Sequence, residues 1–470
     1  MRSLVHEPAT ELVRLVASGD LTAVDVLTAH LEQIDRLNPG MNAFVDLRRD
    51  EALAEARSQD ARAASGEARG PLGGLPVTVK SAIEATGLRC ETGSPSRRGL
   101  VAERDAAVVA RMRAAGAILL GTTNVADMLM AYESENPLHG RTLSPWDPAR
   151  TPGGSSGGES AAIAAGCSAG GIGSDGGGSI RVPAHFAGIC GLKPTPGRIP
   201  GTGHQPPCFG PFSLIGVVGP MARTVRDVYL LFSAIAGWDE GDPMAAPVSL
   251  APLEPSPSRP IRIGFFEDDG RARVTAETRA AVRSAAGAAA AAGHAVEEFL
   301  PSGLERAREL WDVFFCEMAL QVLEEPLRGE EKELPILKEY LRRTRPPLTS
   351  ADFTNAWIDR DVARADLLRQ METHRVLICP VASVPAFRHG ERQWTIDGHE
   401  VRYLDAMSYT QWFNILGNPA AVVPVGTSPE GLPIGVQVVG RPFEEELVLS
   451  VAAAIEAGCG GYRPPPASVR

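Results

Sequence analysis

The feature that most constrains this chain is a glycine-rich stretch from Thr151 to Gly191, TPGGSSGGESAAIAAGCSAGGIGSDGGGSIRVPAHFAGICG. It holds 13 of the 49 glycines of the chain in 41 of its 470 residues, so the enrichment is local. Because glycine lacks a Cβ atom and readily adopts positive φ, successive N–H groups of such a stretch can converge on one anion. The stretch therefore predicts backbone that bends sharply or lies close to another group.

Serine hydroxyls occur at two separated points of this stretch. Ser155 and Ser156 lie in GGSSGG and Ser179 lies in DGGGSIR, and between them the small residues of 161–169 predict a buried helix. A flexible linker is disfavoured because core-type side chains interrupt the small residues throughout. A GxxxxGK[ST] phosphate loop is disfavoured because 153–160 contains no lysine. The residues favour serine nucleophiles.

The charge of the chain argues against a nucleic-acid partner. The formal net charge is −11, the pI is about 5.4, and no run of lysine or arginine stands out. Small neutral or apolar substrates fit this balance better. At 470 residues the chain can bury a large core, as one large α/β domain or as two smaller ones.

The N-terminus and the cysteines favour a cytoplasmic protein. Glu7 and Glu11 interrupt the apolar run that a signal peptide needs. No apolar segment reaches the length of about 18 residues that a membrane span requires. The seven cysteines are scattered and no pair has CxxC spacing, which argues against a metal site or a disulfide framework. We expect reduced, buried thiols.

The order of elements predicts an α/β fold. A strand at 75–80, a helix at 104–116 and a strand at AILLGTTN precede the glycine-rich stretch, and this order implies parallel strands covered by helices. Residues 1–70 form a helical N-terminal part, and 250–371 is mostly helical. Three further buried strands are expected in VLICPVAS, AAVVPVG and IGVQVVG.

Two basic side chains require separate interpretation. Lys80 ends the strand in LPVTVKSAI, a place typical of a solvated surface residue, but its apolar neighbours leave open a buried amine. His185 lies among apolar residues in RVPAHFAG, which favours a core or pocket-wall histidine over a catalytic base.

Four segments together resemble the amidase signature family of serine hydrolases: LPVTVKSAI, GGSSGGESAA, GSDGGGSIRVPA and GICGLKPTPGRIP. The likeness covers most of 4–245 and 374–457 and is weak between Leu250 and Met371. It implies one domain over 1–470, with 250–371 as a divergent region inside it. The implied fold is α/β, a large mixed, mostly parallel twisted sheet with helices on both faces, and no cofactor is implied.

The resemblance also implies a Ser–cisSer–Lys triad. Ser179 would be the nucleophile, Ser155 the bridging serine after a cis Gly154–Ser155 peptide bond, and Lys80 the base. To act as a base Lys80 must be neutral, and desolvation lowers the pKa of a lysine. We therefore expect activity to rise from neutral toward mildly alkaline pH.

Backbone N–H groups of Gly176, Gly177, Gly178 and Ser179 would then form the oxyanion hole. One departure from the family pattern is Gly176, because many members carry a bulkier residue after the aspartate. A glycine there would loosen the loop or widen the pocket.

Five further residues are candidates for supporting roles. Asp175 and Arg181 flank the nucleophile and favour a structural role over substrate binding, and Ser156 is a plausible supporting hydroxyl. Leu129 and Met130 occupy positions that touch the acyl chain in lipid-amide members of the family; ordinary core residues are the equal alternative.

Two functions follow as hypotheses. The first is an amidohydrolase that cleaves a fairly apolar carboxamide, aryl acylamide or carbamate, and esters as well. The alternative is the glutaminase subunit of a glutamine-dependent tRNA amidotransferase, for which we find no lysine-rich docking segment. The sequence leaves a homodimer open, and it does not identify the substrate.

Overall fold

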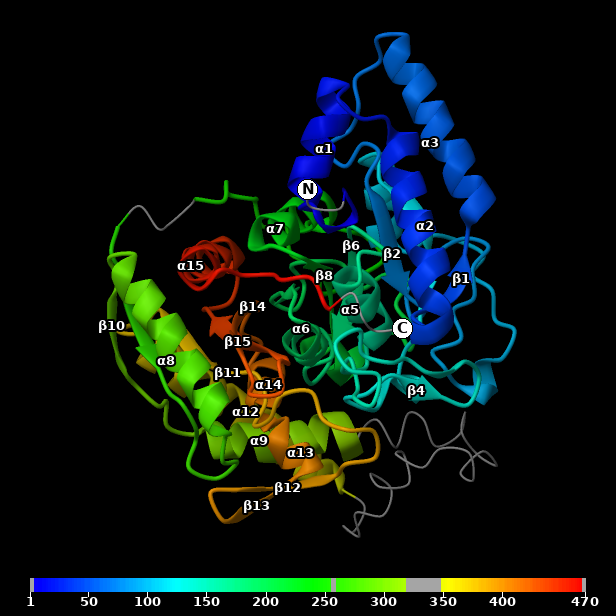
Figure 1. Cartoon of the computed structure of the whole chain (residues 1–470). Helices are drawn as coiled ribbons and strands as arrows, with labels where there is room; N and C mark the ends of the chain where they lie inside the picture. Colours follow the sequence, from blue (N-terminus) through cyan, green and yellow to red (C-terminus); the bar gives the residue numbers. More distant parts are fainter. Residues whose placement is uncertain (1–3, 255–258, 318–347, 467–470) are drawn as a thin grey trace.

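A central sheet of 11 strands organises the computed structural model of this chain, which describes residues 4–254, 259–317 and 348–466 (Figure 1). The strand order is β1-β3-β2-β6-β8-β7-β14-β15-β11-β9-β10. In chain order the strands of this sheet are β1 (Phe44–Leu47), β2 (Pro76–Lys80), β3 (Ile118–Thr123), β6 (Gly170–Asp175), β7 (Cys190–Lys193), β8 (Val217–Ala222), β9 (Arg262–Phe265), β10 (Ala295–Glu298), β11 (Val376–Pro380), β14 (Ala420–Thr427) and β15 (Pro433–Val439).

The predicted large mixed sheet is confirmed, but its parallel pairs are fewer than its antiparallel pairs and form two blocks. Strands β3, β2 and β6 pair in parallel at one side, and β11, β9 and β10 pair in parallel at the other. Between the blocks, β6, β8, β7, β14, β15 and β11 pair antiparallel. The middle of the sheet is therefore antiparallel. The connection from β14 to β15 is one example, since a turn this short can join only antiparallel neighbours.

Helices surround the sheet, and two short antiparallel pairs lie outside it (Figure 1). The pairs are β4 (Glu135–Asn136) with β5 (Gly140–Arg141), and β12 (Gln393–Ile396) with β13 (His399–Arg402). The helices of the described residues are α1 (Ala9–Ser18), α2 (Ala23–Met41), α3 (Arg49–Ala64), α4 (Ala107–Ala114), α5 (Gly157–Ala164), α6 (Arg181–Ala187), α7 (Val225–Ile235), α8 (Ala276–Ala291), α9 (Leu304–Trp311), α12 (Ser350–Gln370), α13 (Tyr403–Ala406), α14 (Ser408–Ile415) and α15 (Glu445–Cys459).

Strand β14 shows that helices cover both faces of the sheet. Ala421 and Val423 join the core cluster that contains α8 and α15. Val422, between them, joins the cluster that contains α6. Because alternate residues of a strand point to opposite faces, the two clusters lie on opposite sides of β14. The predicted cover on both faces is confirmed.

The N-terminal part is built from α1, α2 and α3, and it adds a strand that the sequence did not predict. Helix α2 starts at a capping box, in which the Thr22 side chain accepts from the Asp25 N–H and Asp25 accepts from the Thr22 N–H. Strand β1 follows α2 and pairs with β3 at the edge of the sheet. None of the helices in the described ranges is long and apolar enough to cross a membrane.

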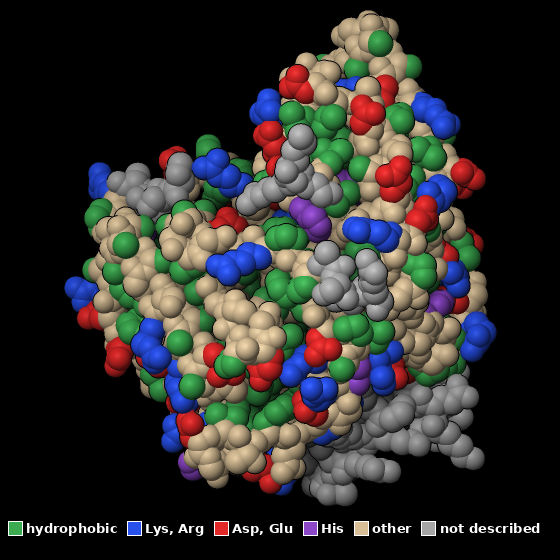
Figure 2. Space-filling model, viewed as in Figure 1, with side chains coloured by type: hydrophobic (Ala, Val, Ile, Leu, Met, Phe, Trp, Pro, Cys, Tyr) green, Lys and Arg blue, Asp and Glu red, His purple; other side chains and the backbone are tan. Residues whose placement is uncertain are grey.

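The region after residue 250 contributes both strands and helices. Strands β9 and β10 extend the sheet, and α8, α9 and α12 accompany them. A π-helical turn, Asp312–Glu317, continues α9. The remainder of the predicted helical segment, 318–347, lies outside the described residues. Figure 2 shows acidic and basic side chains interspersed on one face of the molecule.

Candidate active site

Two parallel strands bring Lys80 next to the glycine-rich stretch. Strand β2 ends at Lys80 and its neighbour β6 ends at Asp175, with Val79 opposite Ile172 in the register. The carboxyl ends of parallel strands meet at one edge of a sheet, the usual place of a site in such folds. Helix α5 starts just after Ser156 and α6 starts just after Ile180, so both serine-containing turns also lie at this edge.

The two serine turns have backbone that suits only glycine. Gly154 packs so closely that an added Cβ atom would lie 2.3 Å from the Glu133 nitrogen. Gly178 has φ of +129°, in the region that disfavours other residues. In the first of these turns, the Gly154–Ser155 peptide bond is cis, as the resemblance implies. The small-residue helix α5 begins at Gly157 and ends at Ala164, earlier than the pattern of small residues predicts.

Lys80 is a buried amine and not a surface residue. Its side chain is 0% exposed, and its Nζ atom lies 2.6 Å from Ser155 Oγ and 3.0 Å from Ser174 Oγ. Burial lowers the pKa of Lys80 to about 7, although the negative charges of Asp175 and Glu159 oppose the shift. A substantial fraction of the amine is therefore neutral near neutral pH.

Ser155 and Ser179 line one cavity with a volume of about 130 Å³. Ser155 is 0% exposed and Ser179 is 9% exposed, so Ser179 is the more accessible of the two serines. Ser156 lies behind them: its N–H donates to the Ser179 carbonyl at 3.2 Å, and its hydroxyl donates to the Ser174 carbonyl at 3.3 Å. Ser156 thus joins the two turns through backbone groups.

Hydrogen bonds to three neighbouring side chains hold the loop from Gly176 to Ser179 in place. The Gly176 carbonyl accepts from Trp311 Nε1 at 2.9 Å, and the Gly177 carbonyl accepts from Tyr132 Oη at 2.9 Å. The Gly178 N–H donates to Asp175 Oδ1 at 2.7 Å. Gly178 was predicted as an oxyanion donor, but this bond commits its N–H to Asp175.

The glycine at position 176 does not widen the cavity. An added Cβ atom there would lie 2.9 Å from Cε2 of Phe315, and the Phe315 ring stacks on Trp311 with centroids 4.7 Å apart. The space that a bulkier residue would occupy is therefore filled by Phe315, which lines the cavity. Gly176 makes room for this aromatic wall.

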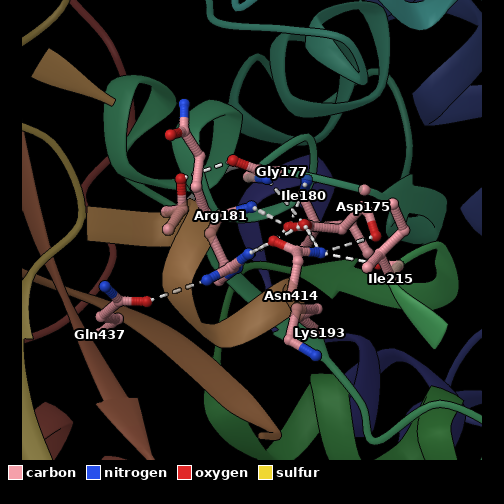
Figure 3. Close-up of polar contacts among 12 residues, drawn as sticks. Asp175, Gly177, Ile180, Arg181, Lys193, Ile215, Asn414 and Gln437 are labelled. Atoms are coloured by element: carbon pink, nitrogen blue, oxygen red, sulfur yellow. Dashed lines mark hydrogen bonds and ion pairs between the residues drawn. The ribbon is translucent and has the colours of Figure 1, made fainter. Parts of the chain in front are cut away.

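Asp175 and Arg181 form a buried ion pair beneath the loop (Figure 3). Both side chains are 0% exposed, and Arg181 donates to Asp175 through Nε at 3.0 Å and through Nη2 at 2.9 Å. Asp175 also accepts from the Ile180 N–H and from Asn414. Burial alone would raise the pKa of Asp175, but the Arg181 guanidinium holds it below its usual range. The pair fixes the loop, which fits the structural role that the sequence favours.

Leu129 and Met130 line the same cavity as the two serines. The sequence left open whether they were core or pocket residues: both line the cavity, and Met130 also belongs to a buried hydrophobic cluster. The other lining residues are mostly apolar or small: Met128, Ser174, Asp175, Gly176, His204, Pro206, Pro207, Cys208, Phe212, Ile215, Gly216, Val217 and Phe315.

His185 is a satisfied core histidine, as the sequence favours. Its Nδ1 accepts from the Gly435 N–H at 2.7 Å, and its Nε2 lies 3.2 Å from the Val384 carbonyl. Burial lowers the pKa of His185 to about 4. The seven cysteines all lie within the described residues, and none of them forms a disulfide there.

Sequence reasoning missed three residues at the site. Ser174 contacts Lys80, His204 contacts Ser174, and Phe315 forms a wall. Ser174 directly precedes Asp175 in the GSDGGGS motif, so its place at the end of β6 was a usable signal. His204 and Phe315 lie outside every motif, and no local pattern identified them.

Known proteins share this sequence pattern and this fold. A family model described as Amidase matches residues 25–449. An indoleacetamide hydrolase of Bradyrhizobium diazoefficiens is 33% identical over 96% of this chain and 86% of its own length. A glutamyl-tRNA(Gln) amidotransferase subunit of Chloroflexus aurantiacus is 33% identical over 97% of both chains. The solved structure of a bacterial aryl acylamidase of the amidase signature family superposes with a TM-score of 0.86, at 26% identity over 96% of both chains.

Proposed function

Because this chain belongs to the amidase signature family and is an amide-hydrolysing enzyme, we propose that it cleaves fairly apolar carboxamides, aryl acylamides or carbamates, and esters as well. One observation carries the proposal. The Nζ atom of the buried Lys80 lies 2.6 Å from Ser155 Oγ, and Ser155 and Ser179 both line a mostly apolar cavity. The substrate is a small molecule, and the intermediate is an acyl-enzyme on Ser179.

The mechanism follows from the order of these groups. Ser155, whose hydroxyl both donates and accepts, passes the proton of Ser179 to neutral Lys80 while Ser179 Oγ attacks the carbonyl carbon. The tetrahedral intermediate expels the amine, which takes the proton back from Lys80 through Ser155. A water molecule then attacks the acyl-enzyme by the same route and frees Ser179.

The oxyanion of this intermediate needs backbone donors. Gly176, Gly177 and Ser179 are the proposed donors, since Gly178 donates to Asp175. The bond from Trp311 to the Gly176 carbonyl supports this assignment for Gly177, because the peptide plane that carries this carbonyl also carries the Gly177 N–H.

The cavity wall supports an apolar acyl or aryl group. Leu129, Met130 and Phe315 face the same space as the serines, and none of the described residues that line it is a lysine or arginine. An apolar group gains free energy by leaving water for such a wall. A carboxylate on the substrate would find no cationic partner among these described residues.

The glutaminase subunit of a tRNA amidotransferase is the second candidate. It is favoured by the identity to the amidotransferase chain of Chloroflexus aurantiacus, which equals the identity to the indoleacetamide hydrolase. Free glutamine carries both an ammonium and a carboxylate, and the apolar wall suits it less well. A cytoplasmic location and a homodimer stay predictions of the sequence.

A hydrolysis screen of the purified chain tests the proposal. The panel contains an anilide, indole-3-acetamide, an aryl carbamate, an aryl ester and glutamine, and labelling by a fluorophosphonate probe locates the nucleophile by peptide mapping. We expect turnover of the apolar substrates and labelling at Ser179. Hydrolysis of glutamine without any turnover of the apolar substrates would establish the second candidate instead, and absence of labelling at Ser179 would refute the serine mechanism.

A further inference from the structure

His204 lies one hydrogen bond behind the base, in the loop between β7 and β8. Its Nδ1 is 2.9 Å from the Pro206 carbonyl oxygen and its Nε2 is 2.8 Å from Ser174 Oγ. Cys208 Sγ lies 3.5 Å from the same Nδ1. Ser174 Oγ in turn lies 3.0 Å from Lys80 Nζ. These contacts form a chain from a backbone carbonyl to the amine.

The Pro206 carbonyl determines which nitrogen of His204 carries the proton. A carbonyl oxygen only accepts, so Nδ1 must donate; the other tautomer would set the Nδ1 lone pair against that oxygen. Burial lowers the pKa of His204 to about 4, so the ring is neutral at neutral pH and its Nε2 is an acceptor. The Ser174 hydroxyl therefore donates its hydrogen to His204.

The three hydrogen-bond partners of Lys80 differ in whether they can donate to its amine. The ammonium form donates to Ser155 Oγ, to Ser174 Oγ and, at 3.4 Å, to the Ser174 carbonyl. The Ser174 carbonyl can only accept, and the Ser174 hydroxyl has its hydrogen committed to His204. Ser155 is then the one partner of the three that can donate, so the lone pair of the neutral amine faces Ser155.

We propose that His204 is a positioning residue which, through the hydroxyl of Ser174, directs the lone pair of Lys80 toward Ser155. The inference rests on the proposed function, because Lys80 is useful as a base only toward Ser155. Without His204, the Ser174 hydroxyl is free to rotate and donate to the Lys80 lone pair. It then competes with Ser155 for the base.

The competition has a predictable effect on pH dependence. A hydroxyl that donates to the lone pair stabilises the neutral amine, so loss of His204 lowers the pKa of Lys80 further. The other ionisable groups that act on Lys80 are Asp175, Glu159 and Cys208, and all three stay in place. The acid limb of the rate profile is therefore expected to move to lower pH while the maximal rate falls.

The experiment is a double-mutant cycle of His204→Phe and Ser174→Ala. The readout is the second-order rate constant of fluorophosphonate labelling at Ser179, measured over a pH range that spans the pKa of Lys80. This readout needs no knowledge of the substrate. We expect His204→Phe to slow labelling by about tenfold or more and to move the acid limb to lower pH. In the Ser174→Ala background the same substitution is expected to change the rate by less than about twofold, because the competing hydroxyl is absent.

Three results are decisive. An equal loss in both backgrounds, or a loss with an unmoved acid limb, would show that His204 only forms part of the cavity wall and would overturn the inference alone. If the wild-type chain is not labelled at Ser179, the proposed function fails and the inference with it. His204→Gln keeps an acceptor for the Ser174 hydroxyl and serves if His204→Phe does not fold. A labelling rate within about twofold of the wild type and an acid limb at the wild-type position are expected for it. An acid limb moved to lower pH in His204→Gln would overturn the inference.

Discussion

The segment 151–191 and the segment 304–317 both line the candidate site, but they are built in opposite ways. In 151–191 every residue except Gly176 is buried, and the backbone lies close to its neighbours throughout. Helix α9 and the π-helical turn after it expose residues such as Glu305 and Arg306 while burying Trp311. The first segment supplies the reacting hydroxyls, and the second supplies the wall. We infer that substitutions in the first stop the reaction, whereas substitutions in the second change which substrates react.

The largest expected effect is that of Ser179→Ala. Loss of the nucleophile should lower the rate of hydrolysis of the best substrate by about 10⁴- to 10⁶-fold. Initial rates measure this loss, and Ser450→Ala in α15 is the matched control, because Ser450 is a buried serine outside the cavity lining. Retention of more than a few per cent of the activity by Ser179→Ala would place the nucleophile elsewhere.

Lys80→Met should have the next largest effect, a loss of about 10²- to 10⁴-fold in the acylation rate. In the wild type that rate should rise with pH through about 7, because the neutral amine is the active form and the pKa of Lys80 is about 7. Lys193→Met is the matched control: Lys193 is also fully buried, and its pKa is also lowered to about 7. A rate independent of pH across this range would remove Lys80 from the mechanism.

Arg181→Met should act on stability. It leaves Asp175 buried without its guanidinium partner, and such a loss costs about 3–5 kcal/mol in the free energy of unfolding. Denaturant unfolding measures the cost, and the double variant Asp175→Asn with Arg181→Met should be less destabilised because no charge stays buried.

The pH dependence has a definite sign. Because the pKa of Asp175 is lowered in the folded chain, the advantage of the wild type over the double variant is full above the ordinary aspartate pKa of 3.8. It is lost as the pH falls below that value. An advantage that grows toward acid pH would contradict the ion pair.

Phe315→Ala should have the smallest effect and tests the second segment. Removal of the ring enlarges the cavity beside Gly176, so the ratio of kcat/KM for bulky over small acyl groups should rise by about tenfold. Glu305→Ala, on the exposed face of α9, should leave the ratio unchanged. A fall in the rate of all substrates by one common factor would instead place Phe315 in the catalytic arrangement.

The sequence predicted the chemistry of the site better than its surroundings. The serines and the strand that ends at Lys80 lie in contiguous motifs, and the resemblance that these motifs carry implied the helices on both faces of the sheet. The burial of Lys80 could not be decided locally, because it arises when β3 and β6 flank β2. His204 and Phe315 lie outside the sequence motifs of the site, and no pattern around either residue predicts that it contacts the site.

Trp311 gives this architecture a practical consequence. Its indole N–H binds the Gly176 carbonyl, and its ring stacks on Phe315, which faces the cavity. A ligand that hydrogen-bonds to the loop or displaces the Phe315 ring changes the environment of the Trp311 indole. Tryptophan emission can thus serve as an intrinsic optical reporter of occupancy, readable in a chain whose nucleophile has been removed and in which nothing is consumed.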